Sequence, residues 1–326
     1  MAGIFKANNP TNGILLVLYA IIIRSAGFFN YTLPIRSADD AFIYRGILKV
    51  LDLGSISWIY PFVTLILIAI QAFYLNRISN SLRLFPKPNY LVGISYLLVA
   101  SIVPQWYHFS APLVASTLII WIFHQMVKLQ LHNNIRPRLF NLGMAVGLCL
   151  YIFPPAILFV VLLFAGLSMF KAFRINEWLI VIIGVAVPIY FYHAWQYLNF
   201  GFVSVRFPQL LLQFPINRLN NLKLTILVAF SVYVVLGFLY SQQNLRKQLV
   251  QTRNAWKLSY VYLFLSAILF FVATATSEFY QIFIAVPVSL LAATAHFYLP
   301  KGWLSNLIHL LMLIFAIYVG YLRDLF

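Results

Sequence analysis

Charged residues are scarce in this sequence. Only 9% of its 326 residues are charged and 63% are hydrophobic, whereas about a quarter of an ordinary soluble domain is charged. So few charges cannot cover so much apolar material in water, and a disordered chain needs low hydrophobicity, so both classes are excluded. At about 20 residues per crossing, the apolar residues suffice for roughly ten membrane helices. The composition therefore predicts an all-α, polytopic integral membrane protein.

Acidic residues and cysteine are almost absent. Six Asp and Glu stand against 22 Lys and Arg, for a formal net charge of +16. In a membrane protein such an excess lies in cytoplasmic loops and orients the helices, so we expect no nucleic-acid partner. The single cysteine, Cys149, excludes a disulfide framework and a cysteine-based metal site. The first apolar run has no small-residue cleavage site after it, and we interpret it as a retained helix.

Apolar runs, separated by charged or proline-rich breaks, predict about ten to eleven transmembrane helices. The candidate segments are roughly 11–31, 58–76, 89–103, 111–127, 139–153, 154–170, 178–197, 223–240, 258–274, 281–297 and 303–321. The break between the fifth and sixth depends on Pro154 and Pro155 alone, and the third to sixth are short enough to include re-entrant segments. We expect residues 1–326 to form a single transmembrane domain.

The basic residues predict the orientation. With the N-terminus in the cytoplasm, 14 Lys and Arg fall on the cytoplasmic side, seven on the outer side, and Arg24 lies within the first helix. This bias favours a bacterial inner-membrane protein with a cytoplasmic N-terminus; eleven helices would end the chain outside and ten would end it inside. Five of the six acidic residues then face outward, Glu177 being the exception. Any active site is therefore expected at the outer membrane–water boundary.

The first outer loop contains a predicted amphipathic helix over residues 37–52. Ile43, Ile47, Val50 and Leu51 recur at three- and four-residue spacing, which is typical of the apolar face of a helix. The segment is too short and too charged to span the bilayer. We expect it to lie flat on the outer leaflet as an interfacial helix.

Asp39 and Asp40 begin this helix and are the candidate catalytic residues. A carboxylate there could take a proton from an acceptor hydroxyl as that oxygen attacks an activated donor, and its neighbour would raise its pKa. The pair could also bind a divalent cation, the only cofactor we consider. The two acids could also have a structural role at the start of the helix, because Ser37 and Asp40 resemble a capping box and acids stabilise helix N-termini. This role is compatible with proton transfer and with cation binding.

Five arginines are candidate ligands for a substrate phosphate, because guanidinium binds phosphate oxygens bidentately. They are Arg24, Arg36, Arg45, Arg206 and Arg218. An arginine inside a membrane helix, as Arg24 is, marks function by default; snorkelling to the outer interface or pairing with a loop acid is its structural alternative. For the loop arginines, the structural alternative is contact with lipid headgroups. The apolar loop 199–221 could line a groove for a lipid tail.

The histidines predict no metal site, because none of them falls at HxxxH or HxxH spacing. The six are His108, His124, His132, His193, His296 and His309. His108 and His193 lie toward the outer side and, with Glu278 of an outer loop, are candidate accessory residues. No Walker loop, GxGxxG or GxSxG motif occurs, which argues against an ATPase.

Four stretches resemble an uncharacterised family of bacterial polytopic inner-membrane proteins. They are Phe5-Lys6-Ala7-Asn8-Asn9-Pro10, Leu84-Phe85-Pro86-Lys87, Tyr151-Ile152-Phe153-Pro154-Pro155-Ala156 and Phe173-Arg174-Ile175-Asn176-Glu177-Trp178-Leu179, within roughly the first 200 residues. Members of that family are sometimes labelled beta-carotene monooxygenase, but an iron oxygenase needs converging ligands, and the scattered histidines give that label no support. The resemblance implies no established activity.

The predicted topology also resembles the C-type (GT-C) membrane glycosyltransferases, which use polyprenyl-phosphate-linked sugars at the outer face. In that superfamily the first outer loop carries interfacial helices and an essential Asp or Glu, the position that Asp39 and Asp40 match by topology. Later outer loops supply basic residues for the donor phosphate, as Arg206 or Arg218 would here. The chain is short for the superfamily and has no periplasmic domain.

Three functions remain open at this point. The first is glycosyl transfer from a polyprenyl-phosphate donor to an extracytoplasmic acceptor, with the lipid bilayer and the polyprenyl-linked donor as partners. The second is a non-catalytic accessory or scaffold subunit, with other envelope membrane proteins as partners. The third is a lipid flippase or transporter, which needs polar groups and broken helices inside the membrane; Arg24, Pro188 and His309 are its only candidates.

Overall fold

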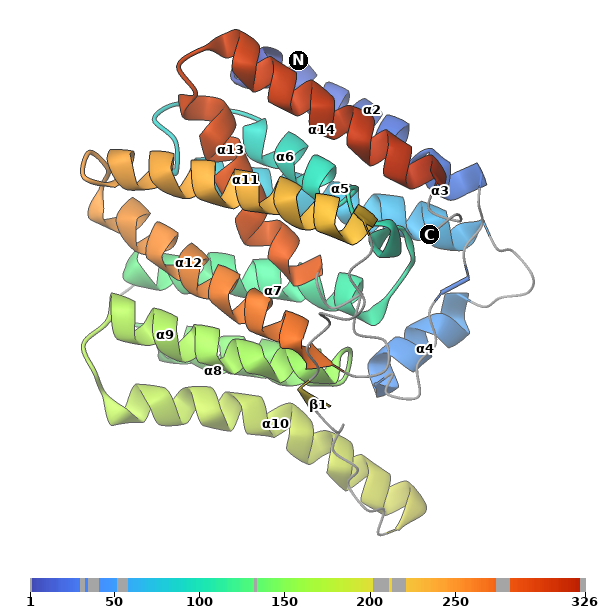
Figure 1. Cartoon of the computed structure of the whole chain (residues 1–326). Helices are drawn as coiled ribbons and strands as arrows, with labels where there is room; N and C mark the ends of the chain where they lie inside the picture. The colour runs from blue at the N-terminus through green and yellow to red at the C-terminus, as the bar shows by residue number, and fades with distance from the viewer. Residues whose placement is uncertain are drawn as a thin grey trace.

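The structure of the protein is a computed structural model that describes residues 2–29, 33–34, 41–51, 58–131, 134–201, 211–212, 221–273 and 282–322. These residues form a bundle of helices that run side by side (Figure 1). Two short strands, β1 (Leu211–Leu212) and β2 (Val272–Ala273), pair antiparallel at one end of it. The predicted all-α class is confirmed.

One helix of nine or more residues occupies most of each of the eleven predicted segments. In the described part these are α2 (Thr11–Arg24), α5 (Ile59–Ser81), α6 (Leu91–Val99), α7 (Ala111–Lys128), α8 (Arg136–Leu150), α9 (Val160–Phe170), α10 (Ile175–Phe200), α11 (Asn221–Leu245), α12 (Val250–Phe271), α13 (Ala285–Tyr298) and α14 (Gly302–Leu322). Shorter elements are α1 (Ala2–Phe5), α3 (Ala26–Phe29), α4 (Phe42–Leu51) and the 3-10 helices η1 (Pro104–Tyr107), η2 (Leu129–Leu131) and η3 (Pro154–Phe159).

Five helices in the described part are long and apolar enough to cross a membrane. They lie at Ile59–Ser81, Ala111–Leu131, Ile175–Phe200, Leu224–Leu245 and Gly302–Tyr321. Shorter apolar helices lie at Thr11–Arg24, Pro154–Phe170 and Ile282–Tyr298. Large apolar side chains are exposed on the outside of the bundle, for example Leu179, Ile183 and Leu311, as lipid-facing residues would be. These features indicate a membrane protein, and a count of ten to eleven crossings stays a prediction.

The shortest of the eleven helices is α6. It ends at Val99, before the predicted end of its segment near residue 103, and all nine of its residues are buried. The N-terminal end is held by asparagines: Asn89 Oδ1 accepts from Leu91 N at 3.0 Å and Asn76 Oδ1 accepts from Gly93 N at 3.1 Å. Both ends of α6 are therefore bonded within the protein, the C-terminal one by Arg24 as described below.

Glycines bring α8 and α10 into close contact. A Cβ on Gly143 would lie 2.5 Å from the Val181 carbonyl oxygen, and one on Gly184 would lie 2.5 Å from that of Phe140. Gly147 lies one turn beyond Gly143 and faces α10 in the same way. Small residues at this spacing let helix backbones approach directly, which is a common basis of helix association in membranes.

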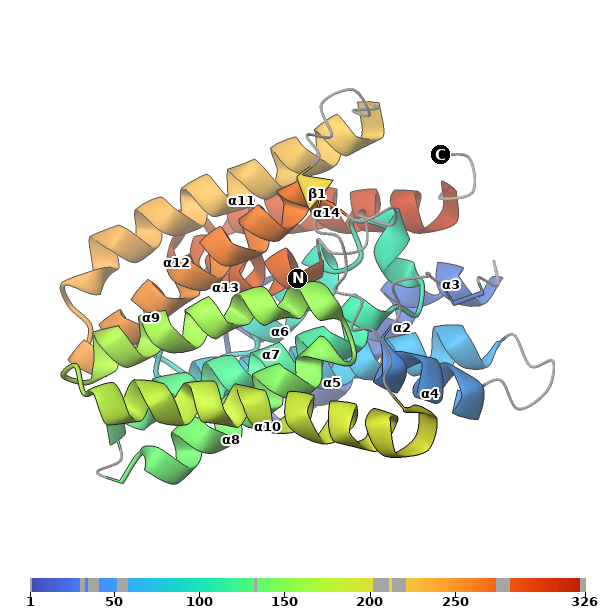
Figure 2. The same ribbon diagram turned by 90° about the horizontal axis from the view of Figure 1, so that it is seen from below.

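The two ends of the bundle differ in character. At the left-hand end in Figure 1 lie the connections α5–α6, α9–α10, α11–α12 and α13–α14, which carry basic residues such as Arg83, Lys87, Lys171 and Lys301. At the right-hand end lie α3, α4, the end of α10 and the start of α11. Figure 2 shows the C-terminal half of α10 extending toward α4 at this end. We call the two ends the basic end and the α4 end.

Candidate functional site

Six of the predicted site residues lie outside the described residues. They are the catalytic candidates Asp39 and Asp40, the phosphate ligands Arg36, Arg206 and Arg218, and the accessory residue Glu278. The structure describes the other four, Arg24, Arg45, His108 and His193. All four belong to elements that meet at the α4 end (Figure 1).

Arg24 is a buried anchor at this end, with only 3% of its surface exposed. Its Nη1 donates to the Trp106 carbonyl at 2.9 Å, its Nη2 to the Ala100 carbonyl at 2.5 Å, and its Nε to the Ser101 hydroxyl at 3.1 Å. The guanidinium also lies over the Tyr107 ring, 4.4 Å from the ring centroid, within the range of a cation–π interaction. Arg24 therefore joins α2 to the end of α6 and to η1.

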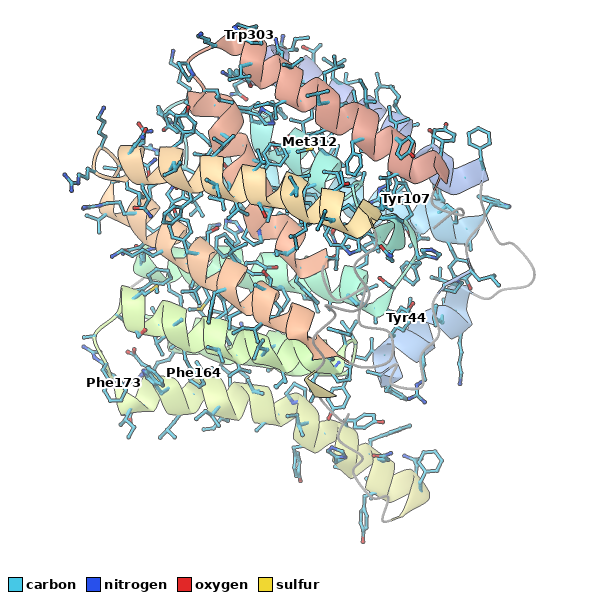
Figure 3. All side chains as sticks on the ribbon, viewed as in Figure 1. Tyr44, Tyr107, Phe164, Phe173, Trp303 and Met312 are labelled. Atoms are coloured by element: carbon cyan, nitrogen blue, oxygen red, sulfur yellow. The ribbon has the colours of Figure 1, made fainter. Side chains whose placement is uncertain are left out.

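Tyr107 extends this anchor to the C-terminal helix. Its hydroxyl lies 3.3 Å from the Ile23 and Ser101 carbonyl oxygens and 3.4 Å from that of Ala316. A Cβ on Gly320 would lie 2.8 Å from the same hydroxyl, so α14 depends on glycine there to come this close. Tyr107 and Tyr44 both lie at the α4 end in Figure 3.

Helix α4 is docked onto the bundle through its first turn. Ile43 N donates to the Tyr151 carbonyl at 2.9 Å, at the end of α8. The Tyr44 hydroxyl donates to the Phe109 carbonyl at 3.2 Å. The Phe42 ring lies 5.3 Å from that of Tyr192 on α10, measured between centroids. These contacts fix the position of α4 against the start of α7, the end of α8 and α10.

The buried face of α4 includes three of the four predicted apolar residues, because Ile43, Ile47 and Leu51 pack against the core and Val50 does not. Tyr44 and Leu48 are fully buried, whereas Val50, expected on the apolar face, is 68% exposed. Tyr44 also belongs to this face: its hydroxyl donates to the Phe109 carbonyl and its ring stacks on the Phe109 ring. Apolar periodicity alone does not predict that a tyrosine such as Tyr44 is buried, because its hydroxyl needs a specific acceptor, which here lies far away in the sequence.

The described candidate residues are close in sequence to residues that contact one another at the α4 end. Arg45 follows Tyr44 on the exposed side of α4, and His108 directly follows η1. His193 follows Tyr192, the α10 residue that contacts α4. The structure thus brings these residues to one end of the molecule, with Arg24 buried beneath them.

A buried histidine pair is a feature that the sequence did not predict. His296 on α13 and His309 on α14 lie with ring centroids 5.7 Å apart. The Tyr19 hydroxyl lies 3.0 Å from His309 Nε2, and the Tyr233 hydroxyl lies 3.2 Å from His296 Nε2. His296 Nδ1 is 3.2 Å from the Ser305 hydroxyl. We call these five residues the histidine–tyrosine cluster.

One signal in the sequence could have found this pair. His296 and His309 lie at nearly equal distances along the chain from Gly302, where α14 begins. Two helices joined by a tight turn run antiparallel, so residues equidistant from the turn face each other. The interpretation of the histidines as scattered is therefore wrong for this pair. Among the residues that the structure describes, no group of three or more His, Cys, Asp and Glu could hold a metal ion.

Two of the family-like stretches meet at the basic end. Tyr90 N donates to the Phe5 carbonyl at 2.8 Å, which joins the first stretch to the chain beyond the second. The Phe85 ring lies 5.2 Å from that of Phe297, and Lys6 Nζ donates to the Phe297 carbonyl at 3.3 Å. Partial burial lowers the pKa of the Lys6 ammonium. These stretches therefore hold α1, α6 and α13 together.

The comparisons with known proteins identify a family and no function. Nothing matches among the curated proteins, and nothing matches among the solved structures, so the glycosyltransferase resemblance has no support from them. The model of one family matches residues 42–324, a longer stretch than the first 200 residues in which the sequence resemblance lies. The chain therefore belongs to the family of unknown function DUF6427.

Proposed function

We propose that this protein is a membrane glycosyltransferase that moves a sugar from a polyprenyl-phosphate donor to an extracytoplasmic glycan, lipid or protein, with Asp39 or Asp40 as the base. The observation that carries the proposal is the anchoring of α4. Asp40 directly precedes Ala41, and the next residues, Phe42, Ile43 and Tyr44, bind α10, α8 and the start of α7. A general base must be held in a fixed position relative to its substrate, and the anchored helix that follows the two carboxylates in the sequence is the described feature that supports this role.

The proposed reaction needs few groups. The carboxylate accepts the proton of the acceptor hydroxyl while the hydroxyl oxygen bonds to the anomeric carbon of the donor. The bond from that carbon to the phosphate oxygen breaks, and polyprenyl phosphate leaves with the electron pair. The proton on the carboxylic acid passes to solvent or to the leaving phosphate, which restores the base. Proton and charge balance without a redox partner.

Basic residues would stabilise the charge that develops on the leaving phosphate. Arg45 and Lys49 are one turn apart on α4 and both are exposed, so they lie on one face of the helix. Arg24 has a different part in this proposal. Its hydrogen bonds to Ala100, Ser101 and Trp106 make it a positioning residue that supports η1 beneath α4.

The first prediction tests the base. The double substitution Asp39→Asn and Asp40→Asn removes the proton acceptor and keeps the side-chain shape, so we expect glycan transfer to fall by about a hundredfold or more. The measurement is the envelope glycan profile of a deletion strain that carries each variant, read by mass spectrometry. Glu177→Gln is the control, because Glu177 lies at the basic end, paired with Arg174 at 3.8 Å, and its change should leave transfer intact.

The decisive comparison is between equally abundant, folded variants. Full transfer by the double Asn variant would rule out the catalytic proposal. It would favour the accessory subunit, for which we expect stable co-purification with other envelope membrane proteins whether or not the two acids are present. The single variants, Asp39→Asn and Asp40→Asn, then show which carboxylate acts.

A lipid flippase or transporter is the second candidate, and the histidine–tyrosine cluster is the observation that favours it. Polar side chains inside apolar helices often mark a transport path, and the cluster joins α2, α11, α13 and α14. If the protein moves lipid, the double variant His296→Phe and His309→Phe should reduce scrambling of a fluorescent phospholipid in proteoliposomes to the rate of protein-free vesicles. His193→Phe, on the part of α10 near α4, is the control. Wild-type vesicles without scrambling would exclude this candidate.

A further inference from the structure

Tyr74 and His124 form a polar pair between α5 and α7, near the basic end and separate from the histidine–tyrosine cluster. The Tyr74 hydroxyl lies 2.8 Å from His124 Nδ1, and the two rings meet edge to face. We assign the hydroxyl as the donor in this bond, which puts the ring hydrogen of the neutral imidazole on Nε2. In this tautomer, and in the protonated ring, His124 Nε2 is a hydrogen-bond donor.

This donor has no hydrogen-bond partner in the part of the chain that the structure describes. His124 is only 6% exposed, and its Nε2 is buried with no hydrogen-bond partner among the described residues. An unsatisfied buried donor is rare, because it forfeits its bond to water without replacement. The side chain is thus held by Tyr74 on one side and presents an N–H group on the other.

Two cations lie near His124. Arg77 lies one turn after Tyr74 on α5, and Lys128 lies one turn after His124 on α7, so each shares a helix face with a member of the pair. The charges of Lys128 and Arg77 both act on the His124 ring, and that of Arg77 also acts on Tyr74. Glu177, the only carboxylate side chain that the structure describes, pairs with Arg174. The group therefore combines positive charge with an unused donor, which suits an anion.

The position of this group favours a lipid. Helices α5 and α7 are both long and apolar enough to cross a membrane, and Arg77 and Lys128 lie toward their ends on the basic side. A row of exposed apolar residues on α5, formed by Phe62, Ile66 and Ile70, leads along the helix toward Arg77. Helix-end cations alone are explained by orientation in the membrane; the buried donor of His124 is not.

We propose that Tyr74, Arg77, His124 and Lys128 form a binding site for the phosphate of an anionic phospholipid, whose acyl chains lie along the exposed flank of α5. The two cations neutralise the phosphodiester, and His124 Nε2 donates to one of its oxygens. Basic sites between membrane helices on the cytoplasmic side bind anionic headgroups in this manner. The site lies at the opposite end from α4 and does not depend on the proposed glycosyl transfer.

The experiment compares two double substitutions at the same end of the bundle. Arg77→Gln with Lys128→Gln removes the proposed site, whereas Arg136→Gln with Arg138→Gln removes the same charge at the start of α8. Native mass spectrometry of purified full-length protein, titrated with phosphatidylglycerol or phosphatidylcholine, gives the affinities. We expect phosphatidylglycerol to bind the wild type and the Arg136/Arg138 variant equally, and the Arg77/Lys128 variant about thirtyfold more weakly.

The histidine gives a second, uncharged test. His124→Phe removes the donor and keeps a ring, so it should weaken binding of phosphatidylglycerol about tenfold; His124→Gln, whose amide nitrogen can donate, should restore most of the loss. Equal affinity in wild type and the Arg77/Lys128 variant, or an equal loss in the Arg136/Arg138 variant, overturns the proposal. Protection from thermal unfolding by inorganic phosphate as strong as that by phosphatidylglycerol would show a free-anion site and would also overturn it.

Discussion

Replacement of Arg24 by leucine is expected to prevent the protein from accumulating in folded form. The change leaves the Ala100 and Trp106 carbonyl oxygens and the Ser101 hydroxyl in the interior without the donor that now binds them. Each unsatisfied buried group costs about 1–3 kcal/mol, and the contact with the Tyr107 ring is lost as well. Together these losses approach the 5–15 kcal/mol that typically separates folded from unfolded protein. Yield of monodisperse protein and thermal unfolding in detergent measure the effect.

Two matched variants identify the cause. Arg24→Lys keeps the charge but not the planar fork that spans three acceptors, so we expect an intermediate loss of stability. Arg45→Leu removes an exposed arginine from α4 and should change the unfolding temperature little, while it tests phosphate binding separately. A stable Arg24→Leu protein that lacks only activity would contradict the anchoring role and restore Arg24 as a direct phosphate ligand.

The substitution Gly143→Ala is expected to have the second-largest effect, because it separates α8 from α10. The new Cβ would lie 2.5 Å from the Val181 carbonyl oxygen and 3.0 Å from Gly184 Cα, and backbone atoms cannot rotate away as side chains do. Overpacking of this kind costs about 1–3 kcal/mol. It outweighs the gain of about 1 kcal/mol that alanine ordinarily brings over glycine in a helix.

Gly46→Ala on α4 is the matched control for this prediction. A Cβ on Gly46 would meet no described residue within 4 Å, so the same substitution should leave the unfolding temperature unchanged or raise it slightly. Gly184→Ala, on the other side of the α8–α10 contact, should reproduce the destabilisation. Equal unfolding temperatures for Gly143→Ala and Gly46→Ala would show that α8 and α10 do not depend on this close approach.

The positions of the helices follow from the sequence because length and apolarity are local properties. Each predicted segment contains a helix, and the break at Pro154 holds, since α8 ends at Leu150 and η3 begins at Pro154. The end of α6 was placed too late, near residue 103. The reason lies in another helix: the Ala100 carbonyl binds Arg24 of α2 and the Ser101 carbonyl lies within hydrogen-bonding distance of Tyr107. Pro104 has no amide hydrogen to bond the Ala100 carbonyl in a continued helix, but no local pattern shows that Arg24 is the replacement donor.

The polar contacts inside the bundle depend even more on tertiary structure. Arg24 binds two backbone carbonyls, a hydroxyl and an aromatic ring, partners that the sequence does not predict; its expected pairing with a loop acid or a phosphate stays a prediction. Backbone carbonyls are present at every position, so a sequence does not show which of them a distant side chain will bind. The His296–His309 pair is different, because its symmetry about Gly302 was visible. The catalytic role of Asp39 and Asp40 stays a prediction.

Helix α6 has a consequence for the way the chain is made. Its nine buried residues span about 14 Å at 1.5 Å per residue, roughly half of the 30 Å hydrocarbon core of a bilayer. Such a segment offers lipid almost no surface and has bonded partners at both ends, so it cannot be stable in the bilayer by itself. Its partners, Arg24 on α2 and Asn76 on α5, are both synthesised earlier. Helix α13, which also packs on α6, is synthesised much later. During insertion, the preceding helices therefore bind both ends of α6 before α13 covers it.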